Sequence, residues 1–118
     1  MRFVISVGNA AKGIWSAVRS ERHMRFHLVA AVVVLLVAGV LGFSPLEWSL
    51  LVAVIAVMIA FELLNTAIEA LVDLVQPEHH PLAGKVKDIA AGACLIFAIG
   101  AAVIGCLLFI PKLIDLLG

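Results

Sequence analysis

Carboxylate and amide side chains recur along the segment FELLNTAIEALVD, residues 61–73. At 100° per residue they fall within roughly one-third of a helix circumference, and apolar residues fill the rest. The polar members of this stripe are Glu62, Asn65, Thr66, Glu69 and Asp73. Mg²⁺ takes only one or two carboxylates from a protein, and phosphate oxygens complete its coordination. The stripe therefore favours metal-assisted chemistry on a phosphate-bearing substrate.

Glu62 is the residue of this stripe that is expected to lie deepest in the membrane. The uncharged run 48–61 precedes it, so it is expected near the edge of the hydrocarbon. Ionisable groups are costly there and face a helix bundle or water. A carboxylate in such a place can act as a base toward an alcohol. For Asp73, a solvated stripe on a cytoplasmic helix extension explains the pattern equally well.

The remainder of the chain must hold this stripe in a membrane. The chain has 118 residues, enough for one domain, and 64% of them are hydrophobic, which exceeds the share in soluble domains. Apolar runs at about 27–43, 46–75 and 86–110 are long enough to span a bilayer, and the second extends into the cytoplasm. Ser44 is predicted to cap the second helix, and Pro111 to end the third.

Residues from about 3 to 22 are predicted to form an amphipathic helix at the membrane interface, because apolar positions recur at helical spacing and the other face is basic. The predicted fold is therefore an all-α integral membrane protein, with this surface helix and three transmembrane helices in one domain, 1–118.

The basic residues set the predicted orientation. Seven of the eight lie before the first span or between the second and third, and only Lys112 lies elsewhere. The N-terminus and the second loop are therefore predicted to be cytoplasmic. Arg19 and Lys85 belong to this cytoplasmic charge, which suits a nucleotide polyphosphate beside a carboxylate-held metal. A salt-bridged helix junction gives a similar pattern, and that alternative remains open.

Two further patterns have ordinary structural explanations. His23 and His27 are four residues apart, too few ligands for a zinc site, and are expected to bond lipid headgroups or backbone. Small residues recur in the third run, where they predict either close helix contact or simple helix propensity. These pairs are Ala98 with Ala102 and Ala101 with Gly105.

The stripe ELLNTAIEALVD, followed by PEHHPLAGKVKD at 77–88, resembles the signature of the prokaryotic diacylglycerol kinase family. The resemblance covers essentially the whole chain. It implies a homotrimer in the bacterial inner membrane, with three spans and a surface helix per chain. It further implies transfer of the γ-phosphoryl group of MgATP to a lipid alcohol at the cytoplasmic interface, without a P-loop.

The resemblance also assigns roles by position. Glu62 matches the catalytic base, and Asn65 matches the asparagine beside it. Glu69 and Glu21 match the metal-binding carboxylates. A further pair, Lys87 and Asp88, matches the residues that engage the nucleotide. The expected site thus has its base at lipid depth and its metal ligand further into the cytoplasm.

The acceptor lipid is indicated by the segment GIWSAVRSERHMRFH, residues 13–27. This segment is more similar to the Gram-positive branch of the family, which prefers undecaprenol, than to the proteobacterial branch, which prefers diacylglycerol. We therefore expect undecaprenol, and no nucleic-acid partner. The alternatives are a small transporter with Glu62 as its proton or cation site, and a purely structural oligomer. The gathering of Glu21, Glu62 and Glu69 at the cytoplasmic edge favours the kinase.

Overall fold

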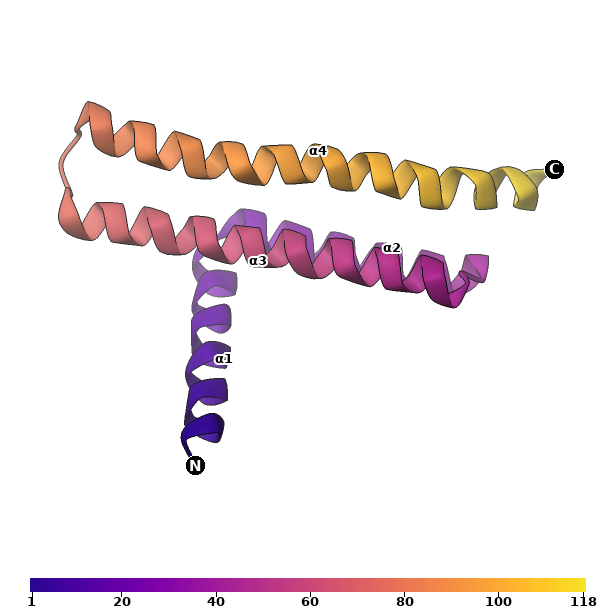
Figure 1. The fold of residues 1–118 in the computed structure, drawn as a ribbon, viewed down its shortest axis with the longest axis horizontal. Helices are drawn as coiled ribbons and strands as arrows, with labels where there is room; N and C mark the ends of the chain where they lie inside the picture. The colour runs from indigo at the N-terminus through magenta and orange to yellow at the C-terminus, as the bar shows by residue number, and fades with distance from the viewer.

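The computed structural model describes all 118 residues, and the chain forms four helices. They are α1 (Arg2–Ser20), α2 (Arg22–Leu41), α3 (Pro45–Val75) and α4 (Pro81–Leu117). Helices α2, α3 and α4 run side by side, whereas α1 projects away from them to one side (Figure 1). The three bundled helices are long and apolar enough to cross a membrane, so the predicted all-α fold with three such helices is confirmed.

Most apolar side chains lie on the outside of this bundle. Only seven of the 118 residues are buried, and the exposed surface of α2, α3 and α4 is dominated by valine, leucine and isoleucine. In water such a surface would be very unfavourable, whereas in hydrocarbon it has no comparable cost. The exposed apolar surface is therefore consistent with lipid around the bundle.

A sharp corner joins α1 to α2. Its only residue outside both helices is Glu21, which has an extended backbone with φ −110° and ψ 116°. The Arg25 guanidinium donates hydrogen bonds to the carbonyl oxygens of Val18 and Arg19, at 2.9 and 2.8 Å. These bonds satisfy carbonyls at the end of α1, which have no partner within the helix. Because the break is a single residue, α2 begins at residue 22 and not at 27 as predicted.

At the opposite end of the bundle, a capping box stabilises the start of α3. The Ser44 hydroxyl accepts from the Glu47 backbone N–H, and the Glu47 carboxylate accepts from the Ser44 N–H, as predicted for an N-cap serine. Glu47 also forms an ion pair with Lys112 of α4 at 3.2 Å. The buried cluster lies beside this cap, and its members are Ala38, Phe43, Leu51 and Leu108. This end is thus held by both polar and apolar contacts.

Helix α4 is longer than predicted at both ends. It begins at Pro81, where the missing N–H of proline costs nothing, and the His80 imidazole Nδ1 accepts from the Leu82 N–H. The predicted end at Pro111 is wrong, because the helix continues through this proline to Leu117. Proline removes one intrahelical hydrogen bond, but the following turns form their own bonds and continue the helix.

Candidate functional site

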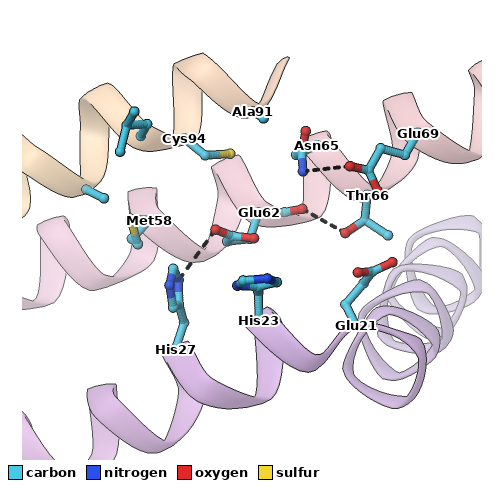
Figure 2. Close-up of a pocket in the computed structure, with 12 residues that line it drawn as sticks. Glu21, His23, His27, Met58, Glu62, Asn65, Thr66, Glu69, Ala91 and Cys94 are labelled. Atoms are coloured by element: carbon cyan, nitrogen blue, oxygen red, sulfur yellow. Dashed lines mark hydrogen bonds and ion pairs between the residues drawn. The ribbon is translucent and has the colours of Figure 1, made fainter. Parts of the chain in front are cut away.

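A polar cavity of about 390 Å³ lies where the α1–α2 corner meets α3 and α4. Figure 2 shows the residues that line it. Its lining is formed by Glu21, His23, His27, Met58, Glu62, Asn65, Thr66, Glu69, Ala91, Cys94, Leu95 and Ala98. The cavity therefore brings together the four residues predicted as base, neighbouring amide and metal ligands. Three come from one face of α3, and Glu21 comes from the corner.

Glu62 is well enclosed in this cavity, with 13% of its side chain exposed. Its Oε1 lies 3.6 Å from Nδ1 of His27 on α2, as Figure 2 shows. The Thr66 hydroxyl donates to the Glu62 backbone carbonyl at 2.9 Å, so it is not bound to the carboxylate. The Glu62 carboxylate thus has no hydrogen bond from within α3 and is available to a ligand.

Asn65 and Glu69 form the next part of the site, one helical turn apart. The Asn65 Nδ2 donates to Glu69 Oε1 at 3.5 Å, and this bond orients both side chains (Figure 2). The Asn65 carbonyl oxygen Oδ1 is buried and has no hydrogen-bond partner. A buried acceptor without a partner is unfavourable unless a ligand completes it. Asn65 therefore offers an oxygen, and Glu69 a carboxylate, to something that enters the cavity.

The donor set of this cavity fits magnesium. Besides the Glu62 carboxylate, it offers the carboxylates of Glu21 and Glu69 and the amide oxygen of Asn65. No group of three or more metal-binding His, Cys, Asp or Glu side chains occurs anywhere in the chain. A dedicated zinc or calcium cage needs such a group, whereas Mg²⁺ takes most of its ligands from water and phosphate. Two carboxylates near a bound polyphosphate are therefore sufficient.

The four residues predicted to bind nucleotide do not line this cavity. Lys87 forms an ion pair with Asp73 at 2.5 Å and lines a separate cavity of about 250 Å³ beside the α3–α4 loop. Lys85 and Asp88 are exposed and line neither cavity, and Arg19 is exposed at the end of α1. Within a single chain, these residues therefore do not gather around Glu62. For Lys87, the salt-bridged junction considered from the sequence is observed.

Two lining residues were missed by the sequence analysis. His27 was expected to bond headgroups or backbone, which is wrong, because its imidazole faces Glu62. Cys94 of α4 donates through its thiol to the Phe61 carbonyl oxygen at 3.5 Å, beside the stacked rings of Phe61 and Phe97. These contacts fix α4 against α3 at the level of Glu62. The i, i+4 spacing of His23 and His27 was the only available signal, since it places both on one face of α2.

A second, apolar cavity of about 450 Å³ continues from the first toward the middle of the bundle. It shares His27, Met58 and Ala98 with the polar cavity. The small residues noted in the third run line it, and they are Ala98, Ala101, Ala102 and Gly105. Their lack of bulk leaves space between α2, α3 and α4. A polar compartment and an apolar compartment thus meet at His27.

Comparisons with known proteins agree on one family. The family model described as prokaryotic diacylglycerol kinase matches residues 8–109. An undecaprenol kinase from Bacillus subtilis (strain 168) is 46% identical over 95% of this chain and 91% of its own length. A diacylglycerol kinase from Escherichia coli (strain K12) is 33% identical over 91% of this chain and 88% of its own. One from Synechocystis is 36% identical over 97% of this chain and 66% of its own.

Proposed function

The chain belongs to the prokaryotic diacylglycerol kinase family and is a lipid kinase, and we propose that it transfers the γ-phosphoryl group of MgATP to undecaprenol. The observation that carries the proposal is the meeting of two cavities at His27, beside Glu62. One contains three carboxylates, and the other is lined almost wholly by apolar side chains. A phosphorylated water-soluble substrate and a lipid alcohol need such neighbouring compartments. The 46% identity to an undecaprenol kinase supports this acceptor over diacylglycerol.

In the proposed reaction, Glu62 is the general base. Its carboxylate takes the proton of the lipid hydroxyl while the hydroxyl oxygen forms a bond to the γ-phosphorus. The bond between that phosphorus and the bridging oxygen breaks, and ADP leaves with its electron pair. Such transfer depends mainly on positioning and on charge stabilisation, so few side chains are needed.

The remaining polar residues of the cavity are proposed to bind Mg²⁺ and the phosphates of ATP. Glu21 and Glu69 are the proposed magnesium ligands, and bound Mg²⁺ neutralises charge on the phosphates. Glu69 is seven residues beyond Glu62, roughly 10 Å along α3. Asn65 lies between them, and its unpaired amide oxygen would accept a hydrogen bond from a water on a bound metal. The order along the helix therefore runs from lipid hydroxyl to nucleotide.

The nucleotide is proposed to be contacted from the cytoplasmic surface by Lys85, Lys87, Asp88 and Arg19.

We further propose that the N-terminus lies in the cytoplasm and that α1 lies in the interface of the bacterial inner membrane. The chain is proposed to assemble as a homotrimer. The exposed apolar surface of the bundle supports assembly in a membrane. Chemical cross-linking in membranes gives the number of chains, and a trimer is expected.

Labelled ATP tests the proposal directly. Purified protein in micelles, supplied with undecaprenol and ATP labelled at the γ-phosphate, should place the label in the organic phase as a lipid phosphate. This transfer should require Mg²⁺. Label found only in the aqueous phase would contradict the proposed acceptor. In that case, a proton-flux measurement across vesicles tests the transporter alternative for Glu62.

A further inference from the structure

His27 stands at the point where the two cavities meet. Its side chain is 23% exposed, and it lines both the polar cavity with Glu62 and the apolar cavity. Its Nδ1 atom is buried and makes no hydrogen bond, and the Glu62 Oε1 lies 3.6 Å away. A buried ring nitrogen without a partner is costly. The distance between Nδ1 and Oε1 is therefore expected to shorten to a hydrogen bond when a ligand displaces water from the cavity.

Among the nitrogen donors of the cavity, His27 is the one that the structure pairs with the Glu62 carboxylate. The lining contains no lysine or arginine. The Asn65 amide N–H is directed to Glu69, and the Thr66 hydroxyl donates to a backbone carbonyl. His23 lines the same cavity, but it is exposed and has no ion pair with a carboxylate. The donor that the packing of α2 against α3 presents to Glu62 is therefore His27.

We propose that His27 is the positioning residue for the catalytic base. Its imidazole donates the Nδ1–H to Glu62 Oε1, which directs the other carboxylate oxygen toward the lipid hydroxyl that enters from the apolar cavity. The proton of the hydroxyl passes to Glu62, and His27 keeps its own proton throughout. The inference rests on the proposed role of Glu62. Hydrogen bonds of this kind are often long in the free enzyme and shorten when substrate binds.

The test replaces His27 by residues that do or do not place a hydrogen-bond donor at the position of Nδ1. Asparagine places its amide nitrogen near the position of Nδ1, whereas leucine has no donor. We expect His27→Leu to lower kcat by about 10- to 100-fold, the cost of a misplaced catalytic group, with the KM for ATP unchanged. His27→Asn is expected to restore most of this loss. Val29→Leu, two residues away on the same helix and outside both cavities, is the control and should leave kcat nearly unchanged.

A double-mutant cycle separates positioning from a general effect on structure. If His27 acts through Glu62, then His27→Leu should cause no further loss in a Glu62→Gln background. Losses that multiply would overturn the inference, as would a wild-type kcat for His27→Leu or an equal loss in His27→Asn. Should His27→Leu fail to assemble, His27→Gln replaces it, because its amide nitrogen lies near the position of Nε2 and not of Nδ1.

The same set of variants distinguishes this inference from the proposed function. If the Glu62→Gln variant is active, Glu62 is not the base, and the proposed mechanism fails. An inactive Glu62→Gln variant beside an unaffected His27→Leu variant would leave the mechanism standing and reject only the role of His27. Thermal unfolding in detergent and size-exclusion chromatography check that every variant is folded and assembled.

Discussion

Replacing Glu62 by glutamine removes the proposed base and almost nothing else. The two side chains have nearly the same volume, and the only ion pair that Glu62 forms is the 3.6 Å approach to His27. The Thr66 hydroxyl binds the backbone at this position, so it is unaffected. A single partly exposed pair of this kind contributes roughly 1 kcal/mol or less to stability. The folded protein should therefore persist.

The effect on catalysis should be far larger. A positioned general base contributes about 10²- to 10⁴-fold in rate. This corresponds to roughly 3–5 kcal/mol in the activation free energy. We expect kcat to decrease by about 10²- to 10⁴-fold. The KM for ATP should be nearly unchanged, because Glu62 lies at the lipid end of the cavity. Glutamine retains the shape of the side chain but cannot take up the proton.

The assay is a coupled measurement of ADP release in micelles with saturating lipid. Glu47→Gln provides the matched control, since it makes the same substitution on the same helix at the opposite end. That variant loses the ion pair to Lys112 and should lose some thermal stability, but it should keep its kcat. A folded, assembled Glu62→Gln variant with more than about one-tenth of wild-type activity would refute the reasoning.

Three further predictions follow from the site. Glu69→Gln should shift the Mg²⁺ titration of activity to higher concentration, and an unchanged titration would argue against its role as a metal ligand. Lys87→Ala should raise the KM for ATP by roughly tenfold, the value of one hydrogen bond to a charged group, whereas Lys112→Ala at the far end of α4 should not. Ala101→Phe should fill the apolar cavity and raise the KM for a long-chain acceptor without affecting ATP, and Val103→Phe on the exposed face is its control. Equal effects of the two phenylalanines would show that the apolar cavity does not hold the lipid chain.

Much of the fold was predictable because hydropathy and capping are local properties. The three apolar runs, the Ser44 cap and the extension of α3 to Val75 all follow from residues near one another in the chain. The errors arose where local signals were ambiguous. Proline is tolerated both within the first turn of a helix and, at some cost, near its end. This is why the start of α4 at Pro81 was missed and Pro111 was taken as its end.

The candidate site divides in the same way. Helical periodicity alone placed Glu62, Asn65 and Glu69 on one face of α3, and the cavity contains all three. Glu21 was expected only through the family resemblance, because its place in the cavity depends on the single-residue break between α1 and α2. His27 was misjudged, since its approach to Glu62 depends on how α2 packs against α3. Such contacts between helices leave no periodic pattern in the sequence.

Undecaprenol is the proposed acceptor of this lipid kinase. The most direct test measures ATP consumption by the purified protein in micelles, with undecaprenol and diacylglycerol at matched mole fraction. We expect Mg²⁺-dependent turnover of both lipids or of undecaprenol alone, with the higher kcat/KM for undecaprenol. A higher kcat/KM for diacylglycerol would contradict the assigned acceptor, and no turnover of either by folded, assembled protein would contradict the proposed reaction.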